Sequence, residues 1–119
     1  MTHAALSTRF TELVGVRYPI VQTGMGWVAT PALAAATSAA GGLGILAAAT
    51  MTYDELAAAI KEVRNRTDAP FGVNMRADQS DVGDRVDLLS REKVRVASFA
   101  MAPKQDRIQR RYDGGVLVI

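Results

Sequence analysis

Short apolar segments alternate with helix-like segments along the whole chain, and this alternation restricts the possible folds more than any other feature. Parallel strands need a long crossover between them, which is usually a helix, whereas antiparallel strands can be joined by a tight turn. The sequence therefore predicts an α/β fold with about five parallel strands and flanking helices. The predicted strands are Tyr18–Gln22, Leu43–Ala47, Phe71–Met75, Val94–Phe99 and Val116–Ile119.

Start and stop signals delimit the predicted helices. Thr30 followed by Pro31 predicts a helix start, and Gly41–Gly42 predicts its end. The segment Thr52–Glu55 has the pattern of a capping box, in which the threonine hydroxyl and the glutamate each bind a free backbone donor. Two further helices are predicted, one marked by Val82, Val86 and Leu89 and one running from Pro103 to Gly114–Gly115.

Composition excludes several classes of protein. Cysteine is absent, so disulfides, thiolate metal sites and cysteine nucleophiles are excluded, and no metal site is predicted. No apolar run reaches the roughly 18 residues of a membrane helix, and Met1–Thr11 lacks the apolar core of a signal peptide. These observations predict a cytoplasmic protein with no membrane partner.

Charge does not favour a nucleic-acid partner. The formal net charge is only +2, and the basic residues near the carboxyl end alternate with acidic and amide residues, as on a solvated helix face. These basic residues are Lys104, Arg107, Arg110 and Arg111. By contrast, no acidic residue lies between Glu12 and Asp54. That stretch is predicted either to be buried or to line a site for a neutral or anionic ligand.

The glycine-rich turn after the first predicted strand allows three interpretations. Gly24, Gly26 and Ala29 fit the dinucleotide-binding spacing G-x-G-x-x-G/A. A dinucleotide site also needs a carboxylate about 20 residues further on, and the second strand ends in alanines and Thr50 instead. The turn can instead bring peptide groups close to a flat ligand, or it can be a tight connection that binds nothing.

The glycines Gly41, Gly42 and Gly44 favour a structural interpretation, namely a helix stop followed by close packing of helix on strand. Ser98, in the fourth predicted strand, faces either the interior of the sheet or a helix, and the sequence does not decide between them.

Three motifs in order resemble the nitronate monooxygenase family, also called 2-nitropropane dioxygenases, which are FMN-dependent TIM barrels. They are Tyr18–Gly26, Ala40–Leu46 and Pro70–Asn74. The resemblance implies that residues 1–119 form a partial TIM-barrel flavin-binding domain, the N-terminal half of a (β/α)8 barrel. The likeness is greatest to actinobacterial members associated with steroid catabolism, which act on coenzyme A thioesters.

The resemblance also implies a cofactor site. Gln22, Thr23, Gly24 and Met25 correspond to the segment that contacts the flavin, and Asn74 corresponds to an asparagine that hydrogen-bonds FMN. These residues follow or end strands, and barrel enzymes place their sites at the carboxyl ends of strands. An amide can donate and accept at once, as the pyrimidine edge of a flavin requires. The alternative for Asn74 is an ordinary capping or loop residue.

The implied function is an FMN-dependent oxidoreductase that oxidises a nitronate or a related acidic-carbon substrate. One alternative is a flavin-dependent dehydrogenase or reductase of a coenzyme A thioester, and another is an inactive half-barrel. Whether the chain is itself an enzyme stays open. The catalytic histidine and phosphate-binding loops of the family have no counterpart here, so no catalytic residue is predicted. The partners expected are a small-molecule substrate and either a second copy or a complementary half-barrel.

Overall fold

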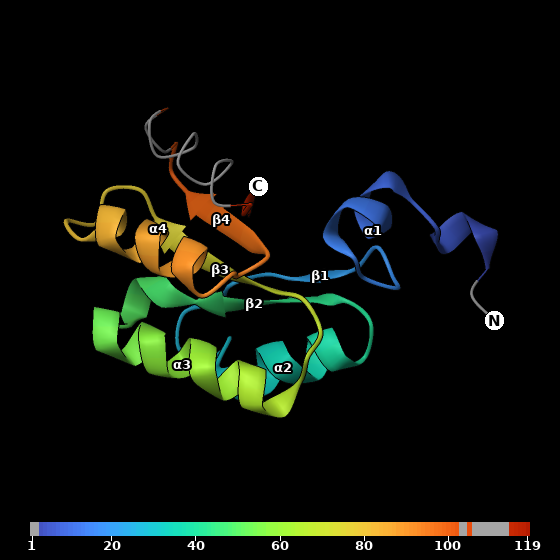
Figure 1. The fold of residues 1–119 in the computed structure, drawn as a ribbon, viewed down its shortest axis with the longest axis horizontal. Coiled ribbons are helices and arrows are strands. Elements are labelled where there is room, and N and C mark those ends of the chain that lie inside the picture. Colours follow the sequence, from blue (N-terminus) through green and yellow to red (C-terminus); the bar gives the residue numbers. More distant parts are fainter. Residues whose placement is uncertain (1–2, 103–104, 106–114) are drawn as a thin grey trace.

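Five parallel strands lie side by side in the order in which they occur in the chain, β1-β2-β3-β4-β5 (Figure 1). The computed structural model describes residues 3–102, 105 and 115–119. The strands are β1 (Val21–Gln22), β2 (Leu43–Ala47), β3 (Phe71–Arg76), β4 (Val96–Ala100) and β5 (Leu117–Val118). The predicted architecture, the N-terminal half of a β/α barrel, is confirmed.

The described α-helices are α1 (Arg9–Val14), α2 (Pro31–Ala39), α3 (Tyr53–Arg66) and α4 (Val82–Arg91), with short 3₁₀ helices η1 (Ala4–Leu6) and η2 (Ala48–Thr50). Helices α2, α3 and α4 are the crossovers that follow β1, β2 and β3, whereas η1 and α1 precede β1. The predicted helix beginning at Pro103, with its basic residues, lies outside the described residues apart from Gln105 and Gly115.

The predicted strand boundaries hold for β2, while β3 extends one residue further, to Arg76, and β5 is shorter than predicted at both ends. The starts of β1 and β4 also need correction. The first strand was predicted from Tyr18, but its ladder begins at Val21. Pro19 has no N–H to donate, and the N–H groups of Arg17 and Tyr18 both bind the carbonyl of Gly41, at 3.0 and 2.9 Å. The fourth strand begins at Val96 rather than Val94, because the Val94 N–H still bonds the α4 carbonyl of Leu89, at 3.0 Å.

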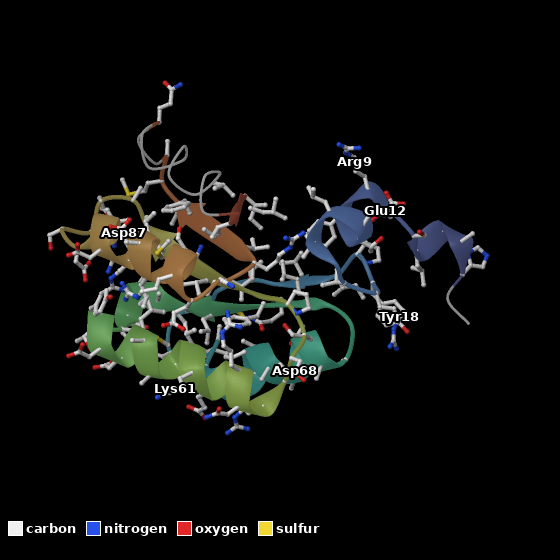
Figure 2. All side chains as sticks on the ribbon, viewed as in Figure 1. Arg9, Glu12, Tyr18, Lys61, Asp68 and Asp87 are labelled. Atoms are coloured by element: carbon white, nitrogen blue, oxygen red, sulfur yellow. The ribbon has the colours of Figure 1, made fainter. Side chains whose placement is uncertain are left out.

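The outer face of the sheet carries the larger core. Side chains of β2, β3 and β4 alternate between two faces, as strand geometry requires, and one face packs on α2, α3 and α4. The fully buried members of this cluster include Leu46, Val73, Met75, Leu56, Ile60, Val63, Val86 and Leu89. In Figure 2 the labelled Lys61 of α3 and Asp87 of α4 lie on the exposed sides of their helices.

The inner face carries a smaller core at the end where the strands begin. Leu43, Ile45 and Val96 pack there against Val14 and Val16, which end and follow α1. The guanidinium of Arg95 also donates through Nε to the carbonyl of Val14, at 3.2 Å. The segment containing α1 therefore covers the amino-terminal end of the strands, at the right in Figure 1.

Helix starts agree with the predicted signals only in part. Thr52 caps α3 by accepting a hydrogen bond from the Glu55 N–H, at 3.2 Å, but no reciprocal bond is found among the described residues. Thr30 stands at the N-cap of α2 without a side-chain cap bond. The complete capping box belongs to α1, where Thr8 and Thr11 bind each other's backbone N–H.

The glycines between α2 and β2 have the predicted structural role. Gly41 has φ +105°, the left-handed conformation that ends many helices. A Cβ atom at Gly44 would stand 2.0 Å from the carbonyl oxygen of Ala34 in α2. The absence of a side chain at Gly44 therefore lets α2 lie directly on β2.

We expect Gly44→Ala to lower the free energy of unfolding by at least about 2 kcal/mol, because the added methyl must push α2 off the sheet. Urea denaturation measures the change. Gly83→Ala is the matched control, since Gly83 lies in α4 with nothing within 4 Å of its added Cβ. That control should be neutral or stabilising by up to roughly 1 kcal/mol, and equal losses in both variants would contradict the packing role of Gly44.

Candidate functional site

Two polar side chains, Asn74 and Ser98, form a polar row on the inner face of the sheet near the carboxyl ends of β3 and β4. The register pairs Ala47 of β2 with Asn74 of β3, and Asn74 with Ser98 of β4. The Asn74 side chain donates from Nδ2 to Ser98 Oγ, at 3.0 Å. Ser98 therefore faces inward beside Asn74, which settles the orientation that the sequence left open.

The glycine turn after β1 lies directly against this row. A Cβ at Gly24 would stand 2.5 Å from Asn74 Cβ, closer than real side chains approach. The turn and the asparagine, which have β2 and two α-helices between them in sequence, are thus brought together at one rim of the sheet. The reason for glycine differs from the expectation, because Gly24 makes room for Asn74 itself rather than only for a ligand.

Gly26 makes a second close contact, with the loop that follows β2. Its added Cβ would meet the methyl group of Thr50, in η2, at 3.3 Å. The turn also returns to β2, where the Ala47 N–H donates to the Ala29 carbonyl, at 3.2 Å. The turn is therefore fixed from both β3 and η2.

The peptide N–H groups of the turn have no acceptor among the described residues. The Met25 carbonyl accepts hydrogen bonds from Val28 and Ala29, at 3.0 and 2.8 Å. Within the part of the chain that is described, no hydrogen bond is donated by the peptide N–H groups of residues 23–27. These donors stand beside Asn74 at the exposed rim, where a ligand with acceptor atoms can meet them.

Gln22 anchors the turn to the sheet. Its Nε2 donates to the carbonyls of Thr23 and Ile45, at 2.6 and 3.1 Å. Its Oε1 is buried and has no partner among the described residues. Within the turn, Thr23 and Met25 are exposed, whereas Gly24 is half-buried. The structure brings all five predicted site residues to the same rim, while their contact with a cofactor stays a prediction.

Two rim residues were missed by the sequence prediction. Trp27 adopts φ +59°, unusual for a bulky residue, and its side chain is 84% exposed beside the turn. Arg76 lies two positions beyond Asn74, so it shares the inner face by strand alternation. That period of two along β3 was the signal available for Arg76.

Arg76 is held by an acidic neighbour. Its guanidinium makes two hydrogen bonds to the Asp78 carboxylate, at 3.0 and 2.7 Å. These bonds hold the pKa of Asp78 below its ordinary value and raise the pKa of Arg76. The pair is exposed, so the rim carries an oriented guanidinium whose charge is balanced by Asp78.

Other features of the described surface do not compete with this rim. The hollow lined by Ala57, Ala58, Lys61 and Glu92 lies over the helices, away from the inner face. Across residues 3–102, 105 and 115–119, no group of three or more acidic or histidine side chains could hold a metal ion. None of the described helices is long and apolar enough to span a membrane.

Comparisons with known proteins relate the chain to a family and to solved structures. The profile named Nitronate monooxygenase matches residues 7–87. A (3aS,4S,5R,7aS)-5-hydroxy-7a-methyl-1-oxo-octahydro-1H-indene-4-carboxyl-CoA dehydrogenase from Mycobacterium tuberculosis is 64% identical over 114 residues, covering 96% of this chain and 32% of that protein. A nitronate monooxygenase from Pseudomonas aeruginosa is 43% identical over 101 residues, covering 82% and 29%. FabK from Thermotoga maritima superimposes with a TM-score of 0.90 at 41% identity, covering 94% of this chain and 36% of that structure.

Sequential parallel strands with their polar residues gathered at the carboxyl rim define the chain as part of a β/α-barrel protein. More particularly, the chain belongs to the nitronate monooxygenase family, a family of flavoenzymes. The predicted family is confirmed, including the likeness to actinobacterial proteins named for a coenzyme A thioester. The chain spans about a third of the length of the curated relatives it matches.

Removing the acceptor of the Asn74 side chain should destabilise the rim modestly. We expect Ser98→Ala to lower the free energy of unfolding by about 1 kcal/mol, the usual net value of a partly buried hydrogen bond. A double-mutant cycle with Asn74→Ala measures the coupling by urea denaturation. Ser90→Ala in α4 serves as the control, and additive effects of Ser98→Ala and Asn74→Ala would contradict the bond.

Proposed function

We propose that this chain supplies one wall of the flavin site in an FMN-dependent oxidoreductase of the nitronate monooxygenase type, acting on a nitronate or a related acidic-carbon substrate. The observation that carries the proposal is the packing of the Gly24 turn on Asn74. It places a run of unpaired peptide donors and a side-chain amide at the carboxyl rim, where β/α barrels bind their ligands.

The residues at the rim fit the edge of an isoalloxazine ring. The N–H groups of residues 23–27 can donate to ring carbonyl and nitrogen acceptors, and they are not used within the described chain. The Asn74 side chain donates one N–H to Ser98, and its carbonyl oxygen can accept a hydrogen bond from a ring N–H. Met25 is 41% exposed and offers a polarizable apolar contact to a flat ring.

Bound FMN would supply the redox chemistry, taking electrons from the substrate and passing them to oxygen or another acceptor. The part of this chain is to bind and orient the ring, since the turn is fixed between β3 and η2. Proton transfer is not assigned to a residue here. The one histidine of the sequence, His3, caps η1 by accepting from the Ala5 N–H, far along the chain from the rim strands.

A second candidate is oxidation or reduction of a coenzyme A thioester. It is supported by the 64% identity to the Mycobacterium tuberculosis protein whose name specifies such a substrate. Arg76 is an exposed guanidinium at the rim, but both of its printed bonds go to the Asp78 carboxylate. An anionic coenzyme A thioester would have to compete with Asp78 for it. A third candidate is an inactive half-barrel, which would bind neither FMN nor substrate.

Binding of FMN to the chain tests the proposal directly. A fixed low concentration of FMN is titrated with protein while the anisotropy of flavin fluorescence is recorded. We expect saturable but weak binding by the chain alone. For Asn74→Leu we expect the Kd to rise about tenfold, because the variant loses the neutral side-chain amide, whose hydrogen bonding contributes about 1.4 kcal/mol.

The matched control is Asn65→Leu, because Asn65 is exposed on α3 and far from the rim. Circular dichroism checks that both variants are folded. No saturable binding of FMN by the folded chain, or equal Kd values for the two variants, would refute the flavin site and favour the inactive half-barrel.

We further propose a cytoplasmic protein that associates through its open sheet, with a second copy or a complementary half-barrel. β1 and β5 are the two edge strands of the described sheet, and exposed edges are templates for further pairing. Apolar side chains are exposed at both edges, including Ile20 and Val21 beside β1 and Ile119 beside β5, the last 54% exposed.

Analytical ultracentrifugation over a range of protein concentrations tests the association. We expect a mass that rises with concentration, and we expect Val21→Lys to shift the equilibrium toward monomer because a lysine on an edge strand opposes pairing. A monomer at every concentration that also binds FMN stoichiometrically would contradict the proposed association.

A further inference from the structure

Arg85 of α4 is a buried charge that the proposed function does not yet use. Arg85 is only 3% exposed. Since arginine is rarely buried without partners, its hydrogen bonds need to be accounted for. Its Nε donates to Asp81 Oδ2 at 2.9 Å, its Nη1 to the Ala48 carbonyl at 2.8 Å and its Nη2 to the Met51 carbonyl at 2.6 Å. Two of its three bonds therefore leave its own helix.

Both carbonyls belong to the loop that follows β2. Ala48 begins η2, and Met51 is the residue that ends it. Gln79 reaches the same loop, with Nε2 3.4 Å from the Ala49 carbonyl. Asp81 stands at the N-cap of α4 without a cap bond, and its Oδ2 accepts a hydrogen bond from Arg85. The pair is thus directed at the loop rather than at the helix start.

The loop held by Arg85 is the one that supports the glycine turn. The methyl of Thr50, between Ala48 and Met51, lies against Gly26. A continuous set of contacts therefore runs from Arg85 through the loop to the peptide groups that stand at the rim. Only arginine offers a planar fork that can reach a carboxylate and two carbonyls at once.

We infer that Arg85 is a positioning residue: it fixes the loop after β2 so that the turn at Gly24–Gly26 keeps the geometry that binds the cofactor. The inference rests on the proposed flavin site for its effect on FMN, but its effect on the turn itself can be measured without FMN. A simple core ion pair, in contrast, would contribute to stability and leave the turn unchanged.

Two measurements on the chain test the inference. The first is the Kd for FMN by flavin anisotropy, and the second is hydrogen exchange at the N–H groups of Val28 and Ala29, which report the turn through their bonds to Met25. Arg85→Lys keeps a positive charge beside Asp81 but cannot make the three bonds together. We expect a Kd raised about tenfold or more, as small displacements of binding groups produce, and faster exchange at Val28 and Ala29.

The controls separate positioning from stability. Arg66→Lys is the control, because Arg66 pairs with Glu62 four residues earlier in the same helix and this pair is exposed at the other end of the sheet. We expect this variant to leave both the Kd and the exchange rates unchanged. Exchange at Thr67, which bonds Val63 in α3, should be unaffected in Arg85→Lys. Should Arg85→Lys fail to fold, Thr50→Ser removes only the methyl against Gly26 and is expected to change the same readouts in the same direction.

The outcomes distinguish the two ideas. If the wild-type chain binds no FMN, the proposed function fails and the exchange at Val28 and Ala29 alone decides the role of Arg85. A folded Arg85→Lys whose exchange at the turn equals that of the wild type, or a Thr50→Ser that changes nothing where Arg85→Lys does not fold, overturns the inference.

Discussion

The parallel pairing of the strands is the constraint on which the rest of this structure depends. Each strand must be entered from the same side, so each is followed by a crossover and all the carboxyl ends meet at one rim. The helices of these crossovers cover the outer face, and their apolar residues form the larger core with Leu46, Val73 and Met75. The polar residues Asn74 and Ser98 are left together on the inner face, in register with Ala47 of β2.

Much of this arrangement could be predicted from local patterns. The segment Leu43–Ala47 is apolar throughout and is fully buried as β2, as a parallel strand should be. The helix beginning after Thr52 follows from its cap and from the spacing of Leu56, Ile60 and Val63. The formation of β2 and α3 depends on residues that are close together in the sequence, so a local pattern is enough to predict each of them.

The rest depends on contacts between distant residues. The close approach of Gly24 to Asn74 joins positions that no local pattern connects, and it changes the reason for the glycine. Helical spacing places Arg85 on the same face as Val82 and Leu89. No local pattern, however, identifies its partners, the carbonyls of Ala48 and Met51. The shortening of β1 arises because the N–H groups before Pro19 bond to Gly41 instead of to a strand. These outcomes are decided by how the elements pack.

The turn combines fixed and free positions in a way that bears on how proteins with this fold diversify. Gly24 and Gly26 are locked by their neighbours, and Ala29 is tied to β2. Between them, Trp27 and Val28 are 84% and 58% exposed. Substitutions at Val28 can therefore alter the surface offered to a substrate at small cost to the fold. A substitution at Trp27 must also tolerate φ +59°, which favours glycine or asparagine and opposes β-branched side chains.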